Sequence, residues 1–512
     1  MNIKKCFKEN IGELLLFVII TAATLLPLAI TGCINFDCDE MMTHPERAME
    51  TIKVSGRYSL LFLKRIFGLE SYRPVLSAVL FIVFFEISII LIGCYIKCAK
   101  RDMLLFGLLI GTSPVWAYTL YFNHQIAEIG AGILILTLCA LIFDHVLTRK
   151  YGSAPTKASV TGAGIIGFIN LAVVFCIFIY QALIVYYIVI LGIVTLTGYE
   201  RDLSEYGKEK SQRISRRKIF VLIINFAITM LIYLIIKRSA PTGVLRTDEM
   251  IKWGVYPAGK CISNIIIEFG KIMLCYGSGN ASLYIFDVAM MILIAVNEYR
   301  SAKAKGDRYK PDGIRLICII LLLAAPLFMS VLLGDRPVRR MQYALQIVSA
   351  YLAVYAIGKL HERKKLISVV CTAWIVIQIL LCTRLVYTNH MRDAKDARIT
   401  DEIVNNLTAL VACDKPVIFI GREEFEGGSI LLEKYDVYGL SFYEWVYNEG
   451  NPYSAAQSAI RYIECSTGVV LTLDENAEHR MEALTISESM PAYPDKGFMA
   501  YMGDYTIINL GR

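Results

Sequence analysis

The sequence contains no pair of cysteines spaced as Cys-x-x-Cys and no cluster of histidine with cysteine. This absence argues against a zinc site and against a disulfide framework. Most of the fourteen cysteines lie inside apolar runs, where cysteine packs as a small hydrophobic residue. A basic face on a soluble domain is also missing, which argues against nucleic acid as a partner.

Two further absences concern targeting and architecture. The first apolar run has no small-residue cleavage site before the polar residues that follow it, so we expect a retained helix and not a signal peptide. No internal repeat and no low-complexity tract occurs, and no apolar segment is clearly broken. Repeated halves and broken helices are typical of transporters, so their absence disfavours a transporter.

The chain is rich in long apolar runs. Hydrophobic residues make up 56% of its 512 residues and charged residues only 19%, which is too apolar for a soluble globular protein. Lysine and arginine cluster in short segments between the runs, which predicts a multi-pass protein of the cell (inner) membrane with a cytoplasmic N-terminus. About eleven spans are expected, at residues 14–31, 74–96, 103–122, 126–146, 160–180, 181–197, 219–236, 283–296, 314–333, 343–360 and 366–386.

The composition changes after the last expected span. We predict that residues 1–388 form a transmembrane domain with a polar first outer loop at 33–73, and that residues 389–512 form a small extracytoplasmic α/β domain. Two roles for this domain stay open: it binds the acceptor molecule of a reaction, or it covers an active site in the transmembrane domain. A helix lying in the membrane interface is expected at 262–276. In the C-terminal domain, helices are expected at 397–410, 454–464 and 477–484, and strands at 416–421, 469–473 and 501–510.

Three carboxylates open the first outer loop. Asp37, Asp39 and Glu40 follow about twenty apolar residues, and charge at a membrane rim is costly unless it is used. A carboxylate held there acts as a general base on a sugar hydroxyl. Alternatively, Asp37 and Asp39 share a divalent cation such as Mg²⁺ or Mn²⁺. A solvated acidic loop is the simpler alternative, and it stays open.

Arginines gather in a later outer segment. Arg336, Arg339 and Arg340 stand on the side of the membrane where the positive-inside trend expects few bases. Guanidinium groups bind phosphate in bidentate fashion and stabilise charge on a leaving phosphate. Contact with lipid headgroups is the alternative. Arg57, after Gly56 in the first outer loop, is a weaker candidate for the same phosphate.

Polar residues also occur at an outer turn and within spans. Asn123 and His124 lie next to Glu128, and His124 is a candidate donor to an acceptor sugar, although a structural role is the alternative for a single loop histidine. Glu86 and Asp287 fall within expected spans, where an acid is either functional or paired with a neighbouring helix.

These motifs resemble a known family. One span followed by a long outer loop that opens Asp37-Cys38-Asp39-Glu40 resembles the GT-C superfamily of glycosyltransferases that use polyprenyl-phosphate sugars. With Ser55-Gly56-Arg57-Tyr58, the Arg-Pro-x-Arg-Arg segment at 336–340 and the Lys-Pro-Val-Ile-Phe-Ile-Gly segment at 415–421, the chain resembles the bacterial glucosyl transferase II family. Those Gtr-type enzymes modify O-antigen and related surface polysaccharides of the cell envelope.

The resemblance implies a reaction and roles for residues. A hexose, with glucose expected, passes from a polyprenyl phosphate to an extracytoplasmic glycan with inversion. Asp37 or Asp39 is then the base, and Arg336, Arg339 or Arg340 stabilises the departing lipid phosphate. Cys38 separates the two aspartates, so which of them is the base stays open.

Two other functions stay open from the sequence. One is a flippase or transporter of lipid-linked glycans, and the other is an O-antigen polymerase or ligase. An enzyme requires the acids of the first outer loop and the 336–340 segment to converge, and a transporter does not.

Overall fold

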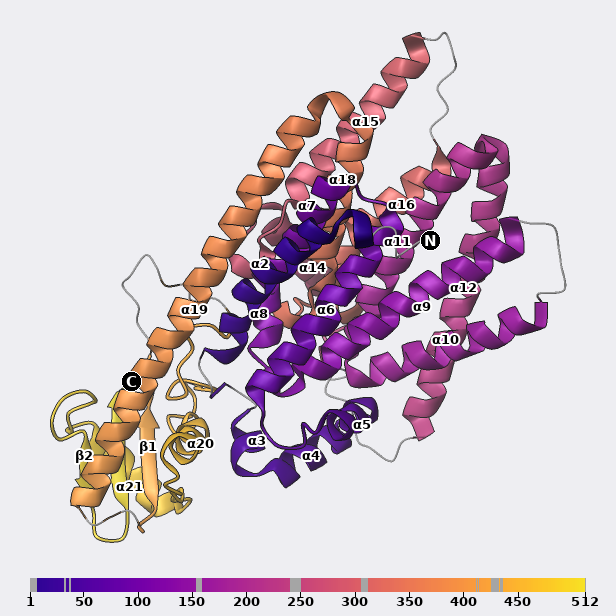
Figure 1. Ribbon diagram of the computed structural model, residues 1–512. Coiled ribbons are helices and arrows are strands. Elements are labelled where there is room, and N and C mark those ends of the chain that lie inside the picture. Colours follow the sequence, from indigo (N-terminus) through magenta and orange to yellow (C-terminus); the bar gives the residue numbers. More distant parts are fainter. Residues whose placement is uncertain are drawn as a thin grey trace. The chain divides into compact units, whose positions relative to one another are not determined.

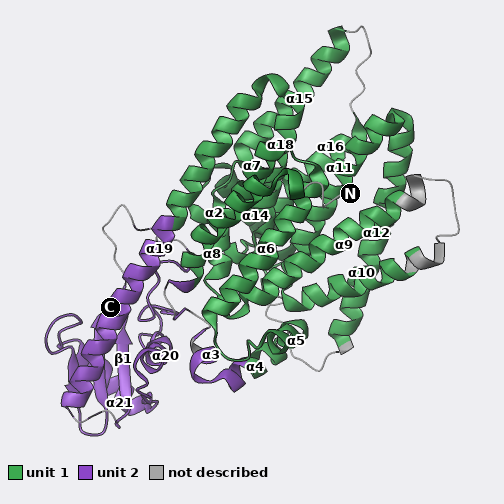
Figure 2. Cartoon of the chain, in the orientation of Figure 1, with its two compact units in different colours: residues 1–29, 49–382 green, residues 30–48, 383–512 purple. Residues whose placement is uncertain are grey.

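The structure is a computed structural model that describes residues 7–31, 34–35, 38–152, 159–239, 250–304, 312–410, 412, 414–424, 432 and 436–511. The chain forms two compact units (Figure 2). Unit 1 contains Met1–Ala29 with Met49–Cys382, and unit 2 contains Ile30–Ala48 with Thr383–Arg512. The boundary expected at residue 388 falls inside a helix, α19 (Lys364–Ala409), which runs from one unit into the other.

Most of the chain is helical (Figure 1). Within the described residues, eight helical segments are long and apolar enough to cross a membrane, so the expected number of about eleven is not confirmed. A helix satisfies its own backbone hydrogen bonds, as a segment surrounded by lipid requires. The eight segments contain α2 (Ile11–Ile30), α6 (Pro74–Ile96), α9 (Ile126–Gly152), α11 (Leu183–Tyr206), α12 (Lys208–Ser239), α15 (Tyr284–Ala304), α16 (Gly313–Ala324) with α17 (Phe328–Leu333), and α19.

Two further apolar helices are not among these eight. They are α10 (Ser159–Ile179) and α18 (Tyr343–Lys359), both where the sequence predicts a span. Large apolar side chains such as Phe220, Leu231 and Ile235 are exposed on α12, a feature typical of a surface that faces lipid. The chain is therefore a polytopic helical membrane protein.

One of the expected spans is broken, which corrects the expectation of unbroken segments. The segment 103–122 divides into α7 (Lys100–Gly111) and α8 (Val115–Leu120), because Pro114 follows Ser113 and proline disfavours helical backbone at the residue before it. The carbonyl of Ile110 accepts from the Ser113 amide at 3.2 Å and from the indole of Trp116 at 2.8 Å, so the indole links the two helices across the break. The segment 314–333 stays helical through Pro326, where one turn is a 3₁₀ helix, η3 (Ala325–Leu327), between α16 and α17.

The polar outer loop expected at 33–73 is largely helical in its described residues. It contains α3 (Asp39–Thr43), α4 (Pro45–Val54) and α5 (Tyr58–Phe67). Gly56 has a φ of 72° between α4 and α5, a left-handed conformation that glycine adopts without strain. The chain therefore turns sharply there and presents Arg57 at the start of α5.

The helix expected near 262–276 is present as α14 (Ala258–Met273). Its polar residues Asn264 and Glu268 are buried, whereas Ile262, Ile266 and Phe269 are exposed. This pattern is the reverse of an amphipathic helix in a soluble protein and suits a lipid surface. Its expected location in the membrane interface stays a prediction.

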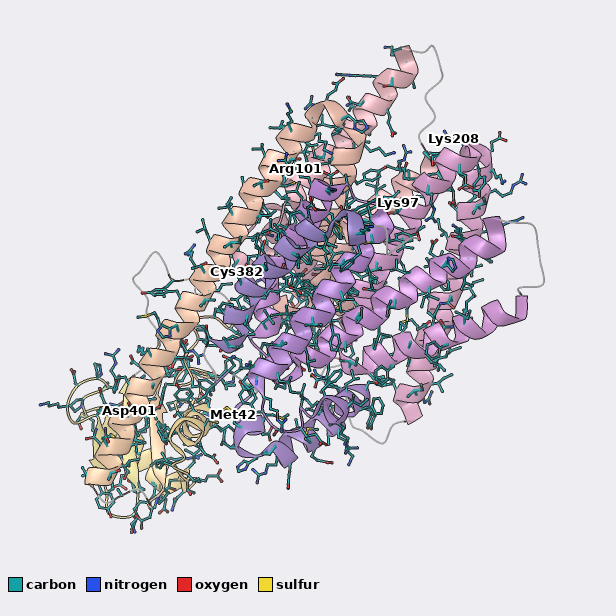
Figure 3. The ribbon with its side chains drawn as sticks, viewed as in Figure 1. Met42, Lys97, Arg101, Lys208, Cys382 and Asp401 are labelled. Atoms are coloured by element: carbon teal, nitrogen blue, oxygen red, sulfur yellow. The ribbon has the colours of Figure 1, made fainter. Side chains whose placement is uncertain are left out.

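Lysine and arginine gather toward one end of unit 1. Lys97, Arg101 and Lys208 lie at the same end in Figure 3. They follow α6, begin α7 and begin α12, so bases at the ends of three different helices lie toward one end of unit 1. The sequence predicts these segments to be cytoplasmic under the positive-inside rule.

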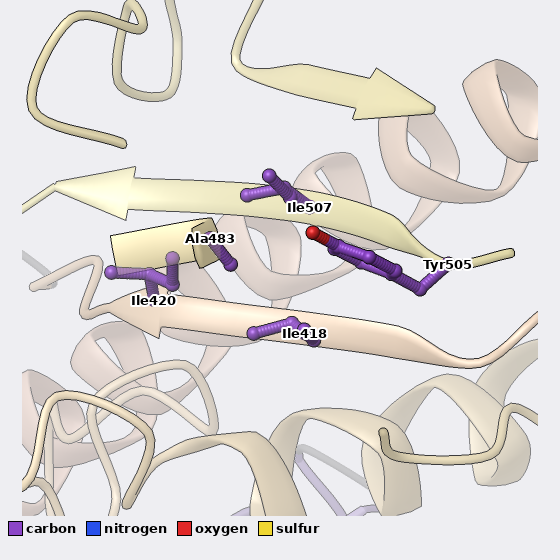
Figure 4. Close-up of a cluster of buried hydrophobic side chains, with 5 residues drawn as sticks. All are labelled: Ile418, Ile420, Ala483, Tyr505 and Ile507. Carbon is purple, nitrogen blue, oxygen red and sulfur yellow. The ribbon is translucent and has the colours of Figure 1, made fainter. Parts of the chain in front are cut away.

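Unit 2 contains a small three-stranded sheet. Strand β1 (Val417–Gly421) pairs parallel with β3 (Thr506–Gly511), and β3 pairs antiparallel with β2 (Met499–Tyr501). Helices α20 (Ala456–Thr467) and α21 (Ala477–Ser487) pack beside it. Ile418, Ile420, Ala483, Tyr505 and Ile507 form the core (Figure 4).

One expectation for this region is wrong. Residues 469–473 are not a strand, since only Leu473 forms an isolated bridge with Val417. The helix expected at 397–410 is present as the end of α19, whose 46 residues span about 70 Å at 1.5 Å per residue. Half of that length would cross a bilayer core of about 30 Å.

Candidate functional site

A buried ion pair ties the first outer segment to the start of α9. Lys64 stands in the last turn of α5, and its ammonium is 3.3 Å from Glu128 Oε1, with side chains 1% and 0% exposed. The same ammonium donates to the backbone carbonyl of His124. Opposite charges attract strongly when both are removed from water, so Lys64 holds the turn at His124 in place.

Arg57 contacts the same turn from the other end of α5. Its Nη1 donates to Gln125 Oε1 at 2.8 Å, and its guanidinium lies 5.6 Å from the centroid of the Tyr180 ring. The side chain is half-buried. A guanidinium stacked on a ring keeps its in-plane N–H donors for other acceptors.

Arg340 reaches this region from the late outer segment. Its guanidinium lies 4.1 Å over the centroid of the Phe122 ring. No carboxylate among the described residues is within ion-pair distance of it. Arg340 is half-buried, so its charge is stabilised by a ring face and partial hydration and not by an acid.

These cations converge on His124. The imidazole interacts electrostatically with Lys64, Arg57 and Arg340, which come from two segments more than 270 residues apart in the chain. We call these three cations, with His124, the cationic cluster. Glu128 supplies one negative charge against three positive ones, so the cluster carries net positive charge.

Aromatic rings pack around the cationic cluster. Tyr343 stacks on Trp116 with 5.7 Å between ring centroids and meets Tyr180 edge-on at 6.2 Å. Rings exclude water and offer faces to a sugar, while guanidinium groups bind phosphate oxygens. The arrangement can therefore hold a sugar phosphate.

Asn123 is engaged in holding the turn. Its Oδ1 accepts from the Tyr72 hydroxyl at 2.9 Å, its Nδ2 donates to the Ala29 carbonyl at 3.1 Å, and its own carbonyl accepts from Ser77 at 2.8 Å. The side chain is fully buried. Asn123 thus joins the ends of α2 and α6 to the turn, while the neighbouring His124 is half-buried.

Arg339 points into a second network, between the late outer segment and α14. Its guanidinium binds both carboxylate oxygens of Glu268 and donates to Asn280 Oδ1 at 2.8 Å. Gln342 donates to Glu268 at 3.1 Å, and Asn264 donates to Asp335 at 2.9 Å. The buried charges of Arg339 and Glu268 are paired with each other. Arg339 therefore holds the 336–340 segment against α14.

Two more bases border this network. Arg336 is exposed, and Lys271 on α14 is half-exposed. Burial, and after it the charges of Arg339 and Arg336, lower the pKa of Lys271. Positive charge is therefore concentrated at this surface as well.

The acids of the sequence prediction belong to unit 2. Asp37 and the side chain of Asp39 lie outside the described residues, and Glu40 is half-buried in α3. The convergence of these acids with the 336–340 segment stays a prediction. Within the described part of the chain, no group of three or more His, Cys, Asp or Glu side chains could hold a metal ion.

Sequence reasoning did not single out Lys64, Gln125 or Tyr180. Lys64 gives a signal, because it interrupts the apolar stretch Ser59-Leu60-Leu61-Phe62-Leu63 where a lysine is buried only with a partner. Nothing in the sequence marks Gln125 or Tyr180, whose roles depend on the packing of α5 against α10 and on the turn before α9.

Comparison with known proteins gives one match. The family model described as glucosyl transferase GtrII matches residues 7–357, more than half of the chain. Arg57, His124 and Arg340 lie within the matched residues, and most of unit 2 lies outside them. No curated protein and no solved structure matches the chain.

Proposed function

Since this chain belongs to the GtrII glucosyl transferase family and is a membrane glycosyltransferase, we propose that it moves a hexose, glucose in the first instance, from a polyprenyl-phosphate donor to an extracytoplasmic glycan. The observation that supports this donor is the cationic cluster, in which Arg57, Lys64 and Arg340 surround His124 beside aromatic rings. A lipid-linked sugar phosphate carries the anion and the sugar that such a surface binds.

In the proposed reaction, the acceptor hydroxyl oxygen attacks the anomeric carbon as the bond from that carbon to the phosphate oxygen breaks. The bonding electrons leave with the polyprenyl phosphate, and the hydroxyl proton passes to a carboxylate. A direct displacement inverts the anomeric centre. Negative charge grows on the phosphate, so donors aimed at it accelerate the step.

Arg57 and Arg340 are assigned to that phosphate. Both are half-buried and both rest on rings, so their N–H groups are partly desolvated and directed by the packing. Lys64 is saturated by Glu128 and the His124 carbonyl, and it is assigned to holding the turn. Arg336 remains a candidate for the phosphate, and Arg339 for shaping the segment that carries Arg340.

The general base is assigned, from the sequence, to the acidic segment, which is residues 37–40. Asp37 or Asp39 takes the proton, with Glu40 contributing charge, and the same pair is the candidate for Mg²⁺ or Mn²⁺. His124 is assigned to a hydroxyl of the acceptor, and Asn123 to the shape of the turn. The acceptor side is proposed to face away from the cytoplasm.

The test is a transfer assay with purified full-length protein in lipid vesicles. Polyprenyl-phosphate glucose and its other hexose analogues are supplied as donors, with and without EDTA, and release of polyprenyl phosphate is measured. Wild type is expected to consume one donor. Asp37→Asn, Asp39→Asn and Arg340→Gln are compared with it.

Arg340→Gln is expected to lower kcat/KM by about 10²- to 10³-fold, the usual effect of removing one donor to a developing oxyanion. Arg65→Gln is the matched control, because Arg65 is a highly exposed arginine of α5 paired with Glu70. A wild-type protein that consumes no lipid-linked sugar, with variants that behave like it, would refute the proposal.

A further inference from the structure

Helices α11, α12 and α16 run side by side in unit 1 (Figure 1), and a groove of about 370 Å³ lies between them. Helix α11 packs against the other two and forms the floor of the groove. Gly192 lies on this floor, where a Cβ atom would come within 3.0 Å of the Leu322 side chain, so glycine lets α16 approach closely. Among the described residues that line the groove, Thr195 has the only hydroxyl and the others are apolar.

The mouth of the groove opens toward lipid. Ile223 of α12 and Ile317 and Leu321 of α16 line the groove and are also exposed. Large exposed apolar side chains on a membrane-spanning helix face hydrocarbon, and Phe220 beside the mouth is exposed in the same way. A buried water needs two or more polar partners, which one threonine does not supply. The groove is therefore suited to a hydrocarbon chain from the bilayer.

The groove has about the length of one leaflet. Its lining residues cover 188–195 on α11 and 317–328 on α16 and α17, which correspond to about 10 and about 16 Å at 1.5 Å per residue. The apolar depth of one leaflet is about 15 Å, half of a bilayer core of about 30 Å. A single acyl chain that enters from one leaflet therefore fits along the groove.

One end of the groove lies at the polar end of the helices. Helices α11 and α12 are joined at Gly207, and Thr195 and Ile219 are equally far from it along the chain, so they lie at the same level. Just beyond them, the Tyr199 hydroxyl donates to the Asp312 carboxylate at the N-terminus of α16. All three helices therefore reach polar or charged residues at this end, which is the level at which a phospholipid carries its phosphate.

Arg216 stands at this end, on the side of the mouth. It precedes Ile219 by three residues and Ile223 by seven, so the three side chains share a face of α12. Its side chain is exposed, and among the described residues no carboxylate lies within ion-pair distance of it. Arg217 is exposed as well, but adjacent residues of a helix point to different faces. Arg216 is therefore the arginine placed to meet a headgroup at the mouth.

Arg216 belongs to a strongly basic stretch. Residues 208–218 contain six lysines and arginines and one acid, Glu209. A cluster of about four to eight bases directly beside a membrane-spanning helix is typical of binding to anionic lipids. Guanidinium groups bind phosphate oxygens through paired N–H donors. The charge at this end of the groove therefore favours a lipid with net negative charge over a zwitterionic one.

We propose that the groove binds one acyl chain of an anionic phospholipid and that Arg216 binds the phosphate of the same lipid. The chain fills the space between α12 and α16, so bound lipid stabilises this side of unit 1. Neither the residues that line the groove nor Arg216 belong to the cationic cluster. The proposal therefore does not depend on the sugar donor or on the acceptor.

The test uses the full-length protein, purified in detergent and stripped of lipid. Phosphatidylglycerol, phosphatidylcholine with the same acyl chains, and polyprenyl phosphate are each titrated. Bound lipid is counted by native mass spectrometry, and stability is followed by thermal unfolding. A phosphatidylglycerol with a photoactivatable group in its acyl chain reports which peptides lie beside that chain.

Two variants test the two parts of the site, and each has a matched control. Arg216→Gln removes the phosphate partner, whereas Arg217→Gln removes a neighbouring exposed arginine on another face. Leu321→Trp fills the mouth of the groove, whereas Ile320→Trp places the same ring on an exposed part of α16 that does not line the groove. All four positions are exposed, so the variants are expected to keep the fold, which their melting temperatures without lipid check.

Wild type is expected to bind phosphatidylglycerol more tightly than phosphatidylcholine and to melt at a higher temperature when it is bound. Arg216→Gln is expected to lower the affinity for phosphatidylglycerol about fivefold, the effect of one base beside an anionic lipid, and to affect phosphatidylcholine less because its ammonium offsets the phosphate. Leu321→Trp is expected to lower both affinities at least about tenfold, because each methylene kept out of the groove costs about a factor of four. Cross-linked peptides are expected from 188–195, 219–226 and 317–328, and both controls are expected to match wild type.

Any of three results would overturn the proposal. The first is equal affinity of wild type for the two phospholipids, or an Arg216→Gln variant that binds like Arg217→Gln. The second is cross-linking outside the groove, or a Leu321→Trp variant that binds like Ile320→Trp. The third is tighter binding of polyprenyl phosphate than of phosphatidylglycerol, which would assign the groove to the lipid of the sugar donor.

Discussion

Arg339 and Glu268 lie 71 residues apart in the sequence and meet in a bidentate ion pair with side chains 7% and 0% exposed. The pair joins the segment after α17 to α14, and Asn280 and Gln342 complete its hydrogen bonds. A buried pair with this geometry tolerates the loss of both members better than the loss of one. This asymmetry separates a structural role from a direct role in phosphate binding.

Arg339→Met is expected to destabilise the protein by about 3–5 kcal/mol, because it leaves the Glu268 carboxylate buried without its partner. The double variant Arg339→Met with Glu268→Met is expected to recover most of that loss. Thermal unfolding in detergent measures both, and Arg336→Gln is the exposed control for stability. Additive losses in the double variant would contradict the structural role.

Phe122→Leu removes the ring face beneath Arg340 while it keeps an apolar side chain at the site. A cation–π contact of this kind contributes about 1 kcal/mol, so donor turnover is expected to fall about fivefold to tenfold. Because Phe122 is buried, the smaller side chain is also expected to lower the unfolding free energy by about 1 kcal/mol, so turnover is compared at a temperature where the variant is folded. Steady-state kinetics with the preferred donor checks the prediction.

Phe62→Leu is the matched control for Phe122→Leu. Phe62 is an exposed ring of α5 that meets Phe175 edge-on at 6.0 Å, and among the described residues no cation lies over its face. An equal loss of turnover in the two variants would show that a general change in aromatic packing, and not support of Arg340, is responsible.

The lowered pKa of Lys271 predicts a dependence of stability on alkaline pH. In the folded protein the ammonium is disfavoured by burial and by Arg339 and Arg336, so the unfolded chain binds more protons than the folded one as pH approaches the usual lysine value of about 10.4. The contribution of Lys271 to the free energy of unfolding therefore rises with pH in that range. Near neutrality the lysine is charged in both states, and this rise is absent.

The change in melting temperature between about pH 8 and about pH 10, below the ordinary lysine pKa, is the measurement. Lys271→Gln lacks the ammonium whose deprotonation favours the folded state at high pH. Its melting temperature is therefore expected to fall more over this pH range than that of wild type. Lys260→Gln is the control, because Lys260 is exposed on the same helix over Tyr256. Identical pH profiles for Lys271→Gln and wild type would refute the assignment.

Apolar run length predicted most of unit 1. The expected span at 74–96 coincides with α6, since hydrophobic length and the flanking Arg73 and Lys97 mark its ends. The break at Pro114 was missed, although proline is a readable signal, because hydropathy alone counts the broken segment as continuous. Helix α19 was cut at 388 because the change of composition was interpreted as a change of structure.

The site could be predicted only as separate pieces. Arg57, His124 and Arg340 were chosen one by one for their chemistry, and their meeting depends on helix packing that no local pattern encodes. Lys64 was not chosen as a site residue, because its pairing with Glu128 depends on the packing of segments distant in sequence. The grouping of the acidic segment with the C-terminal sheet is likewise a matter of contacts distant in sequence.

The end of unit 1 opposite the cationic cluster offers a test of whether stability and turnover are separable. Glu200 on α11 accepts hydrogen bonds from Arg315 at 2.6 and 3.2 Å, from Tyr355 at 2.9 Å and from Lys359 at 2.7 Å, and so joins α11 to α16 and α18. Helix α11 begins at Leu183, three residues after Tyr180, whose ring lies under Arg57. Glu200 lies about 25 Å farther along this helix, at 1.5 Å per residue. Charged hydrogen bonds contribute about 1.5–3 kcal/mol each, and some donors keep other acceptors.

Glu200→Gln is expected to lower the unfolding free energy by about 2–3 kcal/mol, because the neutral amide loses the charge that attracts Arg315 and Lys359. Arg315 retains Glu298, which limits the loss. Glycosyl transfer at a temperature where the variant is folded is expected to stay at the wild-type rate. Glu205→Gln, at an exposed position of the same helix, controls for removing a carboxylate and should change stability by less than about 0.5 kcal/mol. A fall in transfer without a fall in melting temperature would mean that this polar network is coupled to the chemistry and is not only a brace between helices.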